Sequence, residues 1–128
     1  MALEDTGLTG EVIGAAIRVH RVLGPGFLES VYEKALLIEL EESSIRASSQ
    51  VNVRVQYRGR LVGLHRLDLL IDNRLLVELK AVDALNSRHL IVVRSYLKAI
   101  DKEFGLLMNF GCSALDVRRV FAAKIESK

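Results

Sequence analysis

Residues 66–81 read RLDLLIDNRLLVELKA, and this stretch decides the fold. Two apolar runs flank a polar triplet, DNR, and such a triplet is typical of a tight connection between antiparallel strands. The pattern therefore predicts a β-hairpin whose strands span 61–71 and 75–81. Because side chains alternate between the two faces of a strand, the register of this hairpin decides which side chains meet.

Three charged residues interrupt the apolar runs of the hairpin, namely Asp68, Glu78 and Lys80. A two-residue turn would send the two carboxylates to opposite faces of the sheet. A three-residue loop would instead pair Ile71 with Leu75 and set the carboxylates directly across from each other. We expect the three-residue loop or an equivalent bulge. A salt bridge of Lys80 with either acid on a solvated face is the alternative interpretation.

The rest of the chain divides into segments of clear periodicity. Apolar residues recur at helical spacing and predict helices over 10–23, 27–42 and 87–100, alternate over 51–57, and form a continuous run (GLLMNF) over 105–110. Residues 117–125 close the chain as a strand or a helix. The resulting order, ααβββαβ with a tail, predicts an α/β domain with a central mixed sheet flanked by helices. The third and fourth strands would be parallel if adjacent, because a helix joins them.

Composition excludes several classes of protein. The chain has 128 residues, half of them hydrophobic and 27% charged, so we expect one globular domain over 1–128. The single cysteine excludes an intramolecular disulfide and suits the cytoplasm. No apolar run approaches the roughly 18–20 residues of a membrane span. The net charge of +2 permits a polyanionic partner without requiring one.

Two motifs give the chain a family resemblance. Asp68 followed by Glu78-Leu79-Lys80 resembles the D…(D/E)-x-K core of the PD-(D/E)XK nuclease superfamily, whose order of elements is similar. The segment GFLESVY at 26–32 fits G-x-x-E-x-x-Y, and with the segments around it resembles the small bacterial GxxExxY proteins of that superfamily over about 8–121. The resemblance implies a restriction-endonuclease-like core.

The resemblance also implies a divalent-metal site. Its ligands to Mg²⁺ or Mn²⁺ would be the carboxylates of Glu29, Asp68 and Glu78 and the backbone carbonyl of Leu79. The ammonium of Lys80 would orient or activate the attacking water. Supporting roles would fall to Tyr32, which could hydrogen-bond a carboxylate or phosphate, and to Tyr96 and His20. For His20, a cation at the end of a helix is the alternative.

A basic stretch is the candidate for nucleic-acid contact. No acidic residue occurs between Ser43 and Leu67, and the stretch and its border carry Arg54, Arg58, Arg60 and Arg66. Arginines placed this way can bind phosphate backbones. The solvated outer face of a hairpin is an equally good interpretation.

The implied function is a metal-dependent phosphodiesterase acting on DNA, or alternatively on RNA. The other hypothesis is a weak or inactive nuclease-like domain that binds nucleic acid or a protein partner. It draws on Val92, which stands where the family often has Gln in a Q-x-x-x-Y pattern ending at Tyr96. Valine cannot hydrogen-bond a water or a phosphate. A homodimer would enlarge the surface available for either function.

Overall fold

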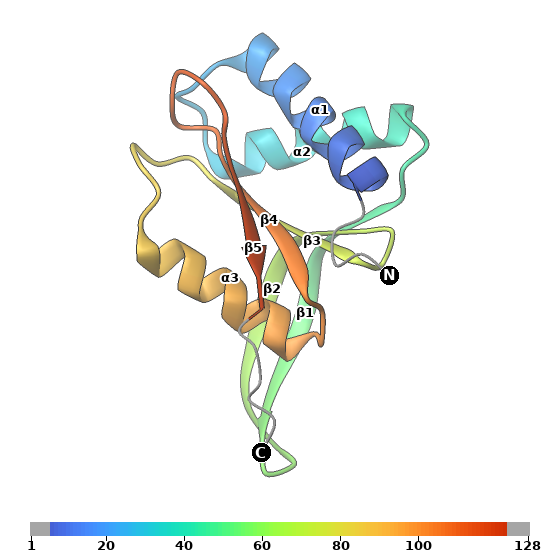
Figure 1. Cartoon of the computed structure of the whole chain (residues 1–128), viewed down its shortest axis with the longest axis vertical. Coiled ribbons are helices and arrows are strands. Elements are labelled where there is room, and N and C mark those ends of the chain that lie inside the picture. The colour runs from blue at the N-terminus through green and yellow to red at the C-terminus, as the bar shows by residue number, and fades with distance from the viewer. Residues whose placement is uncertain (1–5, 123–128) are drawn as a thin grey trace.

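The structure, a computed structural model, describes residues 6–122 (Figure 1). The elements, in chain order, are α1 (Thr6–Leu23), α2 (Glu29–Glu42), β1 (Ala47–Tyr57), β2 (Arg60–Ile71), β3 (Leu75–Lys80), α3 (Ser87–Ala99), β4 (Phe104–Asn109) and β5 (Asp116–Phe121). The predicted order of elements is confirmed, and the tail adds a fifth strand. The predicted residues 123–125 of that tail lie outside the described part of the chain.

The five strands form one mixed sheet in the order β1-β2-β3-β4-β5. β3 and β4 are parallel, as the intervening helix requires, and the other neighbouring pairs are antiparallel. The fold is therefore the predicted α/β class. Within residues 6–122 no helix is long and apolar enough to cross a membrane.

The sheet separates two hydrophobic clusters. α1 and α2 pack on one face, where they bury Leu75, Val77 and Leu79 of β3. α3 packs on the other face, over Leu76 of the same strand. Both faces of β3 are thus covered, which explains its nearly continuous apolar sequence. Glu78 shares the face of Leu76, the face that α3 covers.

β2 changes faces at Asp68. Leu67 packs in the α3 cluster and Leu69 packs in the α1–α2 cluster, although residues two apart on a regular strand share one face. Gln50, the β1 residue opposite Asp68, has a left-handed backbone with φ of 53°. The two strands therefore twist sharply at this row. Beyond it, the β1–β2 hairpin projects away from α1 and α2 and runs beside α3 (Figure 1).

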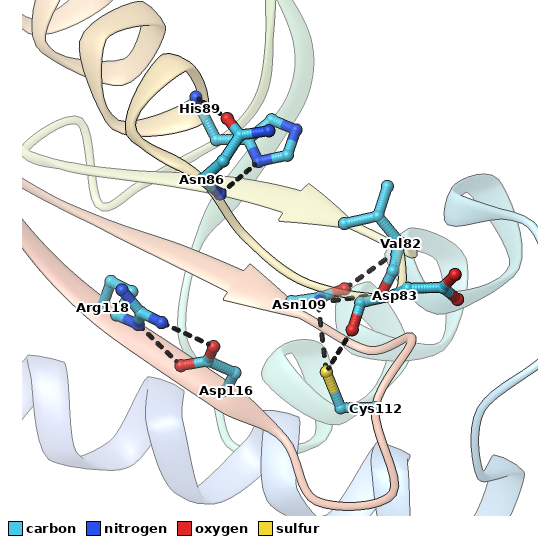
Figure 2. A network of polar contacts seen from close by, with 8 residues as sticks. All are labelled: Val82, Asp83, Asn86, His89, Asn109, Cys112, Asp116 and Arg118. Atoms are coloured by element: carbon cyan, nitrogen blue, oxygen red, sulfur yellow. Dashed lines mark hydrogen bonds and ion pairs between the residues drawn. The ribbon is translucent and has the colours of Figure 1, made fainter.

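An asparagine joins the two loops that follow β3 and β4 (Figure 2). The Asn109 side-chain oxygen accepts hydrogen bonds from the backbone N–H groups of Val82 and Gly111, both at 3.0 Å. Its amide nitrogen donates to the Val82 carbonyl at 2.9 Å and to Cys112 Sγ at 3.2 Å. We call this the Asn109 clasp. It fixes the backbone directly after Lys80.

Candidate active site

Two acids meet where β2 begins to diverge from β3. The three-residue loop is confirmed, because Ile71 pairs with Leu75, and this register sets Asp68 opposite Glu78. Each carboxylate binds the backbone of the other strand. The Asp68 N–H donates to Glu78 Oε2 at 2.7 Å, and the Leu79 N–H donates to Asp68 Oδ2 at 2.8 Å. The carboxylates thereby replace the next bonds of the β2–β3 ladder.

Burial makes this acid pair costly to ionise. Glu78 is 7% exposed, and its burial, together with the Asp68 carboxylate, raises its pKa to about 8. Burial also raises the pKa of Asp68, against the lowering effects of the Leu79 N–H and the Lys80 ammonium. Lys80 favours ionisation of both acids, yet both pKa values stay above normal. A further positive charge nearby would therefore favour the ionised form of both acids.

A hollow of about 480 Å³ opens beside Asp68. It lies between the start of α2 and the β1–β2 strands, and its lining includes Glu29, Glu33, Gln50 and Asp68. Gln50 Nε2 donates to both carboxylate oxygens of Glu33, at 2.9 and 3.1 Å. Burial raises the pKa of Glu33, and Asp68 and Glu29 add to the rise. Together with Ser30, five polar side chains thus surround one concave surface.

Sequence reasoning missed Gln50 because of a β-bulge. The Arg58-Gly59 turn pairs Tyr57 with Arg60, and a regular ladder from that turn would set Gln50 opposite Leu67. The register instead shifts by one residue between Val55 and Gln56. That shift brings Gln50 opposite Asp68. Glu33 was findable from the sequence, since it lies four residues after Glu29 on the same side of α2.

The G-x-x-E-x-x-Y segment comprises the turn before α2 and the first residues of that helix, and its tyrosine holds the turn. The Tyr32 hydroxyl donates to the Gly24 carbonyl at 2.6 Å and accepts from the Phe27 N–H at 3.1 Å. Its buried ring stacks on Phe110 at 4.6 Å. The hydroxyl thus bonds to the backbone of the turn, and the structure gives it no carboxylate partner among residues 6–122. Tyr32 fixes the turn that leads into α2, where Glu29 is the first residue.

Two other predicted supporting residues lie in different places. His20 is 7% exposed, and its Nε2 lies 2.9 Å from the carbonyl oxygen of Cys112, so it joins α1 to the loop after β4. Tyr96 lies on α3 near the acid pair. Burial, Glu78 and Asp68 together raise the pKa of its phenol. His20 thus supports a loop, whereas Tyr96 stands close to the acids.

The four predicted arginines and the valine are all exposed. Arg58 and Arg60 stand at the tip of the β1–β2 hairpin, and Arg54 and Arg66 lie along its strands. Val92 is 38% exposed on α3, one turn before Tyr96. Because its side chain is aliphatic, Val92 makes no hydrogen bond to the acid pair.

The donor set of the acid pair fits a divalent cation in part. Asp68 is half-buried and Glu78 is buried, and their adjacent carboxylate oxygens are the ligands that Mg²⁺ and Mn²⁺ prefer. The backbone hydrogen bonds engage Oδ2 of one and Oε2 of the other. Within residues 6–122, however, no three His, Cys, Asp or Glu side chains are gathered closely enough to hold one ion. Glu29 therefore lines the hollow without completing a three-carboxylate set in this conformation.

The fold and the acid pair together define a nuclease-like α/β domain. Residues 6–120 match the sequence model of the PD-(D/E)XK nuclease superfamily, and the chain belongs to this superfamily. Members generally use divalent metal ions and act on nucleic acids, which suggests a nuclease. The comparison with curated proteins gives no match.

A solved structure shares the fold. The structure described as "Crystal structure of SSO0001" superposes with a TM-score of 0.59 and 15% sequence identity. The match covers 75% of this chain and 50% of that chain, so the present chain spans about half of its length. This similarity concerns the fold alone.

Proposed function

We propose that this chain is a metal-dependent phosphodiesterase that cuts DNA. The observation that carries the proposal is the adjacent pair of half-buried Asp68 and buried Glu78, with Lys80 two residues further along β3. Two adjacent carboxylates that are ionised away from water destabilise the folded chain when no cation lies beside them. Membership of the superfamily suggests the class of reaction, and the acid pair is the proposed location of that reaction.

Each residue of the pair has a role in the proposal. Asp68, Glu78 and the Leu79 carbonyl would hold Mg²⁺ or Mn²⁺, with Glu29 joining them through the hollow. When bound, the cation would supply Lewis-acid polarisation of a phosphate oxygen and a lowered pKa of water. The Lys80 ammonium would orient that water and stabilise the negative charge that develops on the phosphate. The water oxygen bonds to phosphorus while the bond to the 3′ oxygen breaks, leaving a 5′-phosphate and a 3′-hydroxyl.

The finer assignments rest on the motif and the surface. The G-x-x-E-x-x-Y segment supports placement among the GxxExxY proteins, since Tyr32 closes the turn and Glu29 opens α2 beside the hollow. DNA is favoured over RNA as substrate, and a cytoplasmic homodimer is part of the proposal. Two copies would present two acid pairs to a duplex.

A cleavage panel tests the proposal. Supercoiled plasmid, linear duplex, single-stranded DNA and RNA are incubated with Mg²⁺, Mn²⁺ or chelator. The wild-type chain is compared with Asp68→Asn and Lys80→Gln. We expect metal-dependent cutting that each variant lowers by at least roughly 100-fold, the scale of losing one charge-stabilising group.

Glu42→Gln, purified identically, is the matched control. Glu42 is exposed at the end of α2, so its loss should leave cutting unchanged. Cutting that persists in Asp68→Asn would contradict the proposal and indicate a contaminating nuclease.

A domain that binds without cutting is the second candidate. Two observations favour it: Val92 stands near Tyr96 without a polar group, and residues 6–122 hold no gathered three-carboxylate set. Retained metal binding by calorimetry, with no cutting of any substrate, would establish this candidate instead.

A further inference from the structure

A groove of about 620 Å³ lies between the β1–β2 hairpin and α3. The hairpin contributes Arg54, Val55 and His65 to its lining, and α3 contributes Ser95, Tyr96 and Lys98. Its eight lining residues include two permanent cations and no acid. Arg54, His65 and Lys98 are exposed, so a ligand can reach them.

The end of the groove at Tyr96 faces the acid pair. This residue lines the groove, and its ring lies 5.5 Å from the His65 ring. It also packs in the α3 cluster with Leu67, the neighbour of Asp68 on β2, and with Leu76, which shares the face of Glu78 on β3. The hollow beside Asp68 opens on the α2 side of the site, whereas the groove opens on the α3 side. A chain-like ligand that lies in the groove and passes Tyr96 would therefore run toward the acids.

We propose that this groove binds the sugar–phosphate backbone of the nucleic-acid strand that is cut, with phosphates on Arg54 and Lys98 and the strand passing Tyr96 to the acid pair. The inference rests on the proposed function, which it deepens by giving the substrate a path. Paired cations flanking a narrow groove track a phosphate backbone without reading its sequence. The rings of His65 and Tyr96 offer surfaces on which a base can stack.

The proposal divides the arginines of the basic stretch. Arg54 lines the groove, whereas Arg58, Arg60 and Arg66 are absent from its lining. Arg58 lies over the Tyr57 ring at 5.4 Å, at the hairpin tip. We therefore expect Arg54 to matter more for binding than the two arginines at the tip.

Binding is measured without cleavage, in chelator, with labelled single-stranded DNA, single-stranded RNA and duplex DNA of equal length. Arg54→Gln/Lys98→Gln should weaken binding of the preferred strand by at least roughly tenfold. The slope of log affinity against log salt should fall in magnitude by about 1.4, since each contact between a cation and a single-strand phosphate contributes about 0.7.

Arg21→Gln/Arg46→Gln is the matched control. It removes the same charge from α1 and from the residue before β1, and neither residue lines the groove. We expect a loss below roughly threefold and an unchanged salt slope. Equal losses in the two double variants, or no loss in either, would overturn the groove proposal.

Gly63→Leu tests the groove without changing charge. A Cβ at Gly63 would stand 3.6 Å from Val55 and 3.9 Å from His65, both in the lining, and no backbone clash opposes it. We expect weaker binding with an intact fold by circular dichroism. Unchanged binding in this variant would place the strand elsewhere.

Failure of this inference is distinguishable from failure of the proposed function. If Asp68→Asn abolishes cutting while the Arg54/Lys98 double variant cuts with unchanged KM and kcat, the nuclease stands and the groove proposal fails. If no sample cuts, yet the groove variants lose binding and the control pair does not, the groove stands and the nuclease fails.

Discussion

Asn109 and Glu78 are buried polar residues on neighbouring strands, and they differ in how they are satisfied. Both oxygen and nitrogen of the Asn109 amide have hydrogen-bond partners, and the residue is fully buried and neutral. Glu78 accepts one backbone N–H but faces a second carboxylate, and its pKa rises to about 8. A satisfied polar group stabilises a fold, whereas a strained pair of acids lowers stability and so indicates a function.

Asn109→Leu should remove the satisfied polar group and lower the free energy of unfolding more than any other proposed variant. The variant leaves two N–H groups and one carbonyl of Val82 and Gly111 unpaired in a partly buried position. We expect a loss of about 4 kcal/mol in the free energy of unfolding, since each unpaired buried group costs roughly 1–3 kcal/mol and water reaches some of them. Denaturant unfolding measures it. Asn52→Leu, on the exposed face of β1, is the control, and an equal loss there would refute the role of the clasp.

Glu78→Gln should have the opposite effect, because it removes the costly buried acid and raises the free energy of unfolding. A raised pKa means that the folded chain keeps a proton that the unfolded chain releases, so wild-type stability falls as pH rises from about 4.5 to about 8. In chelator at pH 8.5 we expect the variant to be more stable by on the order of 3 kcal/mol, and near pH 4.5 to be equal. Denaturant unfolding across this range checks the sign.

The same pH series also tests whether Glu78 causes the pH dependence of stability. Asp68 and Glu33 have raised pKa values too, so a smaller decline with pH should remain in the Gln variant. Glu42→Gln should leave the wild-type curve unchanged. A variant that is less stable than wild type at pH 8.5 would mean that Glu78 is a structural ion-pair partner of Lys80.

Tyr32→Phe should sharpen the comparison, because Tyr32 is a second neutral clasp. The variant keeps the ring on Phe110 and loses hydrogen bonds to Gly24 and Phe27. We expect a loss of about 1–2 kcal/mol in unfolding free energy. If Tyr32 acts through Glu29, metal affinity by calorimetry should fall as well. Unchanged stability would show that the loop holds without the hydroxyl.

Val92→Gln should have the smallest effect. The side chain is partly exposed, so the amide fits without repacking, and it stands one turn from Tyr96 near the acids. We expect turnover to rise by a few fold, about 1 kcal/mol in the barrier, with unfolding free energy unchanged within about 0.5 kcal/mol. Steady-state kinetics on the preferred substrate measures it. A fall in turnover would show that Val92 already suits this site.

The sequence predicted the elements and the acid pair because both depend on short-range pattern. The DNR triplet and the alternation around it set the register of Asp68 and Glu78 without reference to the rest of the chain. Gln50 was not predicted because a bulge that begins five residues away, at Val55, shifts its partner. Asn109 was not predicted because Val82, its partner in the other loop, lies 27 residues away in sequence, and a sequence pattern does not show which loops meet.

The bulge between Val55 and Gln56 also divides the hairpin by its tolerance to insertions and deletions. Changes of length at the tip, over 57–61, leave the register below the bulge intact and should accumulate freely among relatives. A one-residue change between the bulge and Gln50 would carry that amide off the row of Asp68 and exchange the faces of every side chain between them. Evolution of this protein can therefore vary the tip of the hairpin while its base stays fixed in length.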